Sequence, residues 1–252
     1  MKIAGRSGHN PLAKGAVGIV DETTEDRKIF LASKKYLQEV GNEFIECYPG
    51  NMNGISTELM WGINKANNSG ASLFYSVHLN KAYNSYDGAI GSEIWLHPIA
   101  SKTTIKKANN ILKNLESLGF KNRGIKYSRD LAELNSTAME AMIIESFFCE
   151  AIGDVNLYKK VGADALGFAI ANGIDSRVKK NNEVKVDMKT IVLYFGDMDA
   201  NAAIYVAQKN QCPMMKKSDF DVSGLKAEKI IQIGGKAGST RYDSLKDAGK
   251  LV

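Results

Sequence analysis

The sequence predicts an α/β protein, with a twisted, mostly parallel sheet flanked by helices and a small C-terminal α/β domain. Two observations predict this class. Over residues 1–178, short apolar or β-branched runs alternate with longer amphipathic segments, the order typical of a parallel sheet covered on both faces. A polar, charged stretch at 179–188 then precedes a shorter βαβ pattern at 189–252. We therefore expect two domains joined by a linker.

The elements of the first domain follow from hydrophobic spacing and capping residues. In the first helix, 24–40, apolar residues recur at helical spacing. Asp21, Thr23 or Thr24 is expected to cap its N-terminus, and Gly41 to end it. The other predicted helices are 56–68, 101–118 and 154–175. The predicted strands are 1–6, 42–48, 71–79, 92–99 and 140–148.

The second domain is predicted as strand 190–195, helix 198–209 and strand 229–235. So short a segment buries a small core by itself. A homo-oligomer formed through this domain would add buried area, and the sequence leaves that alternative open.

Composition excludes several classes of protein. The chain has 252 residues, 44% hydrophobic and 24% charged, which is ordinary for a globular protein. No apolar run approaches the roughly 18 residues of a membrane span. The net charge is +5, but the basic residues are scattered, so nucleic acid is not predicted as a partner. Residues 1–15 lack the apolar core of a secretory signal, and three widely spaced cysteines suit a reducing compartment.

Four side chains that can bind a metal ion or transfer a proton lie near predicted strand ends or helix starts. His9 and His78 each follow an apolar strand, Glu22 begins the first helix, and Glu145 ends the run AMII. In an open parallel sheet, ligands bind outside the carboxyl ends of the strands. Two histidines and one carboxylate can hold a catalytic zinc with one position free, and a further carboxylate can take a proton from water.

Each residue also has a simpler interpretation. His9 could cap a turn, and His78 could be a hydrogen-bonded core histidine. Glu22 could simply be an acidic residue in the first turn, where it interacts favourably with the helix dipole. Glu145 is harder to explain in this way, because an unpaired buried carboxylate is costly. His97 is interpreted as structural.

A series of motifs, taken in order, resembles the zinc-dependent N-acetylmuramoyl-L-alanine amidases, especially those of clostridial and listerial phage endolysins. The resemblance extends over about residues 1–175. The motifs are SGHN, VDETTEDRKIFLASKKYL, SVHLN, GSEIWL, NRGIK and LNSTAMEAMIIESFF.

The resemblance implies zinc as cofactor, with His9, Glu22 and His78 as its ligands and Glu145 as the catalytic glutamate. Glu25 is the alternative to Glu22. The implied reaction is hydrolysis of the amide between N-acetylmuramic acid and L-alanine in bacterial peptidoglycan. The runner-up is a zinc carboxypeptidase or endopeptidase acting on stem peptides, and a third alternative is a non-catalytic wall-binding protein.

Asn80 and Arg123 each have two interpretations. Asn80 could hydrogen-bond substrate or cap a turn, and Arg123 could contact a stem-peptide carboxylate or lie in a surface turn.

Without an export signal, a phage lysin is expected to wait in the cytoplasm of the host bacterium until the membrane is opened.

The C-terminal domain resembles the small cell-wall-binding modules of clostridial phage endolysins, through TIVLYFGDMDANAAIYVA, KIIQIGG and GSTRYDSL. The resemblance implies a wall glycan as its partner. Gly234 and Gly235 are interpreted as a tight turn or a close approach to ligand. Gly238, Ser239 and Arg241 are candidates for binding an anionic glycan or for a plain salt bridge. Whether Met188 is an internal translation start is left open.

Overall fold

The computed structural model describes residues 1–179, 188–235 and 240–251. The chain divides into two compact units, Met1–Lys180 and Asn181–Val252, which we call the N-terminal unit and the C-terminal unit. Most of the predicted linker, residues 180–187, lies outside the described residues. Within the described residues, no helix combines the length and the apolar character needed to cross a membrane.

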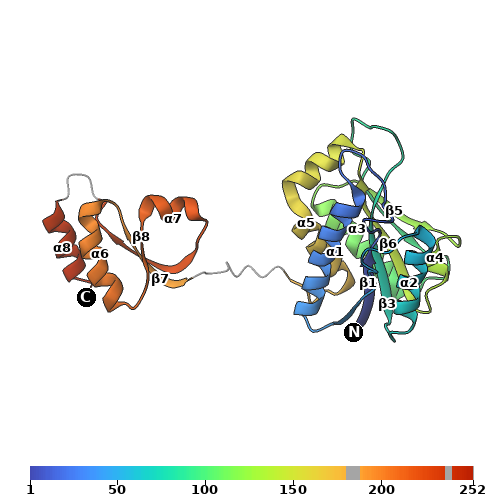
Figure 1. The fold of residues 1–252 in the computed structure, drawn as a ribbon, viewed down its shortest axis with the longest axis horizontal. Coiled ribbons are helices and arrows are strands. Elements are labelled where there is room, and N and C mark those ends of the chain that lie inside the picture. The colour runs from blue at the N-terminus through green and yellow to red at the C-terminus, as the bar shows by residue number, and fades with distance from the viewer. Residues whose placement is uncertain (180–187, 236–239, 252) are drawn as a thin grey trace. The chain divides into compact units, whose positions relative to one another are not determined.

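The N-terminal unit is a six-stranded sheet with helices on both faces (Figure 1), and the predicted fold class is confirmed. The strand order is β2-β1-β3-β6-β4-β5. All neighbouring strands run parallel except β4 and β6, which are antiparallel. The strands are β1 (Lys2–Ser7), β2 (Glu43–Glu46), β3 (Leu73–Asn80), β4 (Ser92–Leu96), β5 (Asn122–Tyr127) and β6 (Glu140–Phe148).

Helices α1, α3 and α5 cover one face of this sheet, and α2 and α4 cover the other (Figure 1). The larger core lies on the first face, where side chains such as Ile3 and Val77 are fully buried. Alternate residues such as Ala4 and Phe74 form the second core, as strand geometry requires. The helices are α1 (Glu22–Glu39), α2 (Ile55–Asn67), α3 (Lys102–Ser117), α4 (Ala132–Asn135) and α5 (Ile152–Ile174).

Helix α1 begins at Glu22, two residues before the predicted start, and one of the three candidate capping residues caps it. The Asp21 carboxylate accepts a hydrogen bond from the Thr24 backbone N–H at 3.1 Å, so Asp21 is the N-cap. Gly41 follows the helix with φ of 81°, a conformation typical of helix ends. Because Asp21 is the cap, Glu22 is the first helical residue, and its carboxylate accepts a hydrogen bond from the Leu79 backbone near the end of β3.

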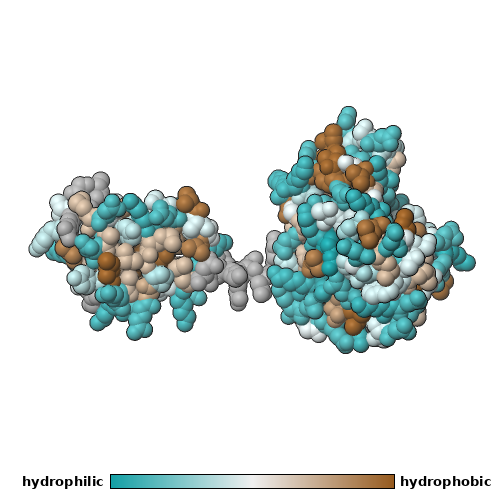
Figure 2. Space-filling model, in the orientation of Figure 1, coloured by the Kyte–Doolittle hydropathy of each residue, from teal (hydrophilic) through white to brown (hydrophobic). Residues whose placement is uncertain are grey.

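Figure 2 shows a mostly hydrophilic surface on the N-terminal unit, interrupted by separate hydrophobic patches. Part of the exposed apolar surface comes from the loop between β1 and α1, where Leu12, Val17 and Ile19 are about half exposed.

The C-terminal unit has a three-stranded parallel sheet of order β8-β7-β9. Its core joins the sheet to α6 and α8. The strand–helix–strand sequence was predicted, although β7 begins at Met188, which had been placed in the linker. The elements are β7 (Met188–Tyr194), α6 (Asp197–Lys209), β8 (Met214–Lys216), α7 (Lys217–Ser223), β9 (Ala227–Ile233) and α8 (Arg241–Gly249).

Gly234 and Gly235 follow β9 with positive φ, 82° and 80°. A Cβ on Gly234 would lie 2.2 Å from the Asp199 carboxylate, and one on Gly235 would lie 2.7 Å from the Phe195 ring. Backbone conformation and close packing therefore account for both glycines, and the tight turn stays a prediction. Gly238, Ser239 and the side chain of Arg241 lie outside the described residues.

Candidate active site

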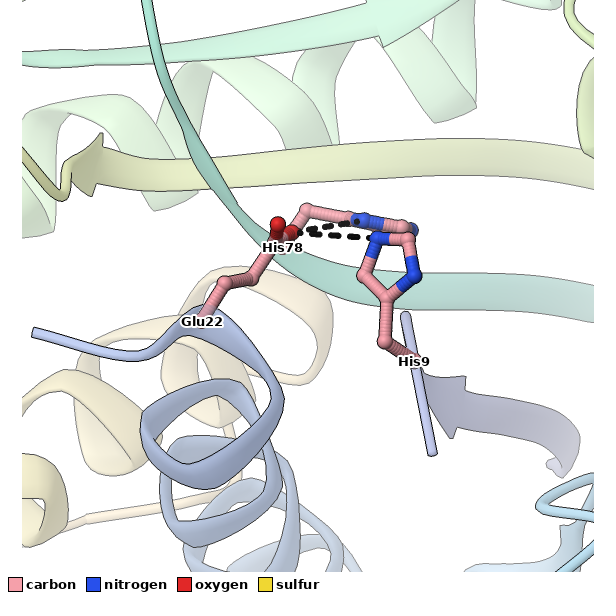
Figure 3. Close-up of side chains that lie close together, drawn as sticks. All are labelled: His9, Glu22 and His78. Carbon is pink, nitrogen blue, oxygen red and sulfur yellow. Dashed lines mark hydrogen bonds and ion pairs between the residues drawn. The ribbon is translucent and has the colours of Figure 1, made fainter. Parts of the chain in front are cut away.

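The structure brings together His9, Glu22 and His78, three of the four predicted site residues (Figure 3). Glu22 Oε1 lies 3.4 Å from His9 Nε2 and 3.1 Å from His78 Nδ1. One donor atom from each residue falls within 4.8 Å of the others. The two imidazole rings meet edge to face, with centroids 5.1 Å apart.

Each donor is positioned by a different element. His9 follows β1, and Glu22 is the first residue of α1. His78 lies inside β3, two residues before its end, and not just past the strand as the sequence suggested. The Glu22 carboxylate is fixed by backbone N–H donors from Ala16, at 2.7 Å, and from Leu79, at 3.1 Å.

This donor set fits a zinc ion. Four donors about 2.1 Å from one ion in a tetrahedron lie about 3.4 Å from each other, close to the two measured separations of 3.1 and 3.4 Å. Two imidazole nitrogens and one carboxylate oxygen are also the donor chemistry that zinc accepts. His9, Glu22 and His78 therefore fit zinc in donor chemistry and in their two separations from Glu22.

The electrostatics of the cluster favour an ionised carboxylate. Burial raises the pKa of Glu22, but hydrogen bonds with His78 and His9 outweigh it and leave that pKa lowered. For His78, burial lowers the pKa, but contacts with Glu133 and Glu22 outweigh it and raise it. An ionised carboxylate is the form that binds a metal ion.

Two glycines leave room for the donors. A Cβ on Gly8 would lie 2.2 Å from Cε1 of His78, and one on Gly15 would lie 2.3 Å from Oε2 of Glu22. Because real atoms do not approach so closely, any side chain at either position would displace a donor.

Glu145 lies in the same cleft as the two histidines. The cleft has a volume of about 420 Å³, and His9, His78 and Glu145 line it. Glu145 on β6 pairs in register with His78 on β3. Within the part of the chain that the structure describes, its Oε2 is buried without a hydrogen-bond partner. Burial raises the pKa of Glu145 to about 7, and the nearby Glu22 carboxylate adds to the effect.

Glu25 does not join the cluster. Its carboxylate bonds the Lys28 ammonium at 2.8 Å and the Tyr158 hydroxyl at 2.5 Å. His97 also lies outside the cluster, where its Nδ1 accepts a hydrogen bond from the Ile99 backbone at 3.3 Å. The geometry therefore favours Glu22 over Glu25.

A buried ionic network that the sequence reasoning missed lies under the cluster. The Arg6 guanidinium is fully buried, pairs with the Glu58 carboxylate and donates to the carbonyl of Gly8 at 2.7 Å. Glu133 accepts a hydrogen bond from Ser76, and its Oε2 lies 3.8 Å from Nε2 of His78. A charged residue in the apolar strand KIAGRS was the available signal, because a buried arginine needs a partner.

Asn80 and Arg123 share one partner, Glu93, which the sequence reasoning also missed. Asn80 Nδ2 donates to Glu93 Oε1 at 3.0 Å, and Arg123 Nε donates to Glu93 Oε2 at 2.9 Å. Asn80 also accepts a hydrogen bond from the Lys81 backbone at 2.7 Å. Arg123 lies on β5, an edge strand where the sequence had suggested only a turn.

A family model described as N-acetylmuramoyl-L-alanine amidase matches residues 3–176. The chain belongs to this family. Its N-terminal unit is therefore an amidase unit, and the predicted enzyme class is confirmed at the level of the family.

Solved amidase structures resemble the amidase unit. The catalytic domain of the CD27L endolysin targeting Clostridia difficile is 29% identical and superposes with a TM-score of 0.61, over 69% of this chain and 96% of that chain. The catalytic domain of CwlV from Bacillus (Paenibacillus) polymyxa is 25% identical, with a TM-score of 0.60, over 71% and 99% of the two chains.

Curated relatives come from clostridia and bacilli. An uncharacterized 38.4 kDa protein of Clostridium perfringens is 43% identical over 193 residues, which are 77% of this chain and 56% of that protein. The sporulation-specific N-acetylmuramoyl-L-alanine amidase of Bacillus subtilis is 29% identical over 114 residues, 44% of this chain and 42% of that protein. The chain spans about half the length of the curated relatives it matches.

Proposed function

We propose that this chain is a zinc-dependent hydrolase that cleaves the amide bond between N-acetylmuramic acid and L-alanine in bacterial peptidoglycan. One observation carries the proposal. Donor atoms of His9, Glu22 and His78 lie together beside the cleft that Glu145 lines. Membership of the amidase family supports the same reaction.

In this proposal His9, Glu22 and His78 hold the zinc ion. Three protein donors leave one coordination position free, as in catalytic zinc sites. When bound, zinc supplies a Lewis acid that polarises an amide carbonyl and makes water nucleophilic near neutral pH. The backbone bonds to the Glu22 carboxylate keep that donor oriented before substrate arrives.

Glu145 acts as the general base and then as the general acid. Its carboxylate accepts the proton of the attacking water as the new C–O bond forms. It then passes that proton to the nitrogen of L-alanine as the C–N bond breaks, so the stem peptide leaves as a free amine. The position of Glu145 in the cleft beside His78 supports this role.

We also propose that the chain is a phage endolysin that lyses its bacterial host from the cytoplasmic side, and that its C-terminal unit binds a wall glycan. The similarity of the amidase unit to the catalytic domain of the CD27L endolysin supports the first part. The division of the chain into two compact units is consistent with separate catalytic and targeting tasks.

The test is product analysis by mass spectrometry. The purified chain is incubated with peptidoglycan, with and without a chelator. The proposal predicts whole stem peptides with a free L-alanine amine, and no release when the chelator removes zinc. Stem peptides shortened at the carboxyl end but still attached to glycan would instead identify a carboxypeptidase. If no product were released, the remaining alternative would be a non-catalytic wall-binding protein.

A further inference from the structure

Two exposed tyrosines lie stacked on the loop between β3 and β4. The rings of Tyr83 and Tyr86 have centroids 5.6 Å apart and planes 21° from parallel. The residues are 56% and 39% exposed. Because both rings bury little surface within the chain, the pair does not serve the hydrophobic core.

Buried carboxylates hold this loop in place. Glu150 accepts hydrogen bonds from the backbone N–H groups of residues 82–83, at 2.8 and 2.9 Å. Asp154 accepts from those of residues 90–91, at 3.2 and 2.9 Å. Both carboxylate residues are at most 1% exposed. The loop is therefore anchored near both ends, and the tyrosines are presented in a fixed arrangement.

A pocket of about 330 Å³ lies beside the pair, lined by both tyrosines together with Lys121 and Arg123. Because Arg123 Nε bonds the Glu93 carboxylate at 2.9 Å, its charge is already compensated within the chain. The pocket thus offers two aromatic faces, with Lys121 as a second cation at its edge, which suits a polar ligand that has an apolar face.

The pocket adjoins the catalytic cleft through Glu93. That residue bonds Arg123, which lines the pocket, and Asn80, which lines the cleft. Glu93 also pairs in register with Glu145 on the neighbouring strand β6. Glu93 therefore connects a residue that lines the cleft with a residue that lines the pocket, so a long substrate in the cleft that extends past Asn80 would run toward the tyrosine pair.

We propose that Tyr83 and Tyr86 form a subsite that stacks against a sugar ring of the glycan strand. This inference rests on the proposed function, in which the substrate carries neutral N-acetylated sugars. The C–H face of a pyranose complements the electron-rich face of an aromatic ring. Tyrosine also loses little side-chain freedom on binding. Of the two cations that line the pocket, Arg123 is engaged with Glu93, so a stem-peptide carboxylate could pair with Lys121 alone and is the less favoured ligand.

The kinetic test compares substrates with many sugars and with one sugar. The variants are the double substitution Tyr83→Ala with Tyr86→Ala, the matching double substitution to Phe, and Tyr127→Ala as a control. Tyr127 is 50% exposed on β5 and does not line the pocket. The substrates are polymeric peptidoglycan and a single N-acetylmuramoyl-pentapeptide.

The alanine pair is expected to lower kcat/KM on the polymer about tenfold by raising KM. A tenfold change corresponds to the loss of one good aromatic contact. Its activity on the single-sugar substrate should be unchanged, and the Phe pair and Tyr127→Ala should match the wild type on both. An equal loss on both substrates, or no loss on the polymer, overturns the subsite.

A binding measurement separates this inference from the proposed reaction. The full chain carrying Glu145→Gln is titrated calorimetrically with a soluble tetramer of N-acetylglucosamine, with and without the alanine pair. We expect binding that weakens about tenfold in the alanine pair. Absent binding, or binding that the substitutions do not change, overturns the inference. Failure of the wild type to release stem peptides would refute the proposed function alone.

Discussion

Glu22 Oε1 lies 3.1 Å from His78 Nδ1, although 56 positions separate the two residues in the sequence. The contact joins the first turn of α1 to the end of β3. It is possible because β1 and β3 are hydrogen-bonded neighbours, so the chain that leaves β1 returns next to His78.

Zinc content should depend on Glu22 and His78 and not on Glu25. We expect the wild type to hold about one zinc per chain, and Glu22→Gln and His78→Ala to lose it, because each removes a donor. Glu25→Gln is the matched control, since that carboxylate bonds Lys28 and Tyr158 instead. Elemental analysis after dialysis measures the difference. Full zinc in His78→Ala would remove that residue from the ligand set.

Glu145→Gln should keep zinc and lose hydrolysis. A glutamine has nearly the same shape but cannot accept a proton, and general base catalysis contributes about 10²- to 10⁴-fold. Glu140→Gln on the same strand is the control, because Glu140 bonds the Ser101 backbone away from the cleft. Release of stem peptides from purified walls gives the rate. If Glu145→Gln hydrolysed walls at the wild-type rate, another residue would be the base.

Arg6→Ala should destabilise the amidase unit by about 3–5 kcal/mol, because it leaves the Glu58 carboxylate buried without its partner. Lys35→Ala, at an exposed pair with Glu39, should cost less than about 1 kcal/mol. Urea unfolding followed by circular dichroism measures both. Similar losses in the two variants would mean that the Arg6 pair contributes no more than a surface pair.

Asp175→Asn should reduce stability more at neutral pH than in acid. Hydrogen bonds from the Arg177 guanidinium hold the pKa of Asp175 well below its usual value, and Asn42 adds to the effect. A carboxyl with a lowered folded-state pKa stabilises the protein above its usual pKa of about 4, and that contribution disappears as the pH falls further. The gap in melting temperature between variant and wild type should therefore shrink from pH 7 to pH 3. A gap that is constant with pH would contradict the ion pair.

A chain ending at residue 187 should bind zinc as the full chain does and sediment less with cell walls. The amidase unit has its own buried core, and the metal donors all lie in it. Co-sedimentation with purified walls and elemental analysis are the two measurements. Unchanged sedimentation would argue that the C-terminal unit serves assembly and not targeting.

The sequence was sufficient to predict which residues would converge. His9, His78 and Glu145 belong to three adjacent strands, β1, β3 and β6, and parallel strands place their carboxyl ends at one edge of the sheet. The start of α1 was predicted less exactly: Asp21 was one of three candidate caps and the helix was expected from residue 24, whereas it begins at Glu22.

Other features could not be located from the sequence, even where a residue such as Arg6 signalled that a buried partner was needed. Strand β5 is an edge strand with exposed residues and a glycine at φ 78°, so its sequence looks like a turn. The partners of Arg6 and Arg123 lie 52 and 30 positions away. Hydrogen bonds over such distances follow from the packing of several elements, which hydrophobic spacing does not encode.

Gly8 and Gly15 have a consequence for judging related sequences. Each lies so close to a metal donor that an added methyl group would overlap it. A homologue with alanine at either position would keep His9, Glu22 and His78 but would have to move one of these side chains to make room for the methyl group. The residues that leave space for a candidate donor therefore matter for comparing sequences as much as the donors themselves.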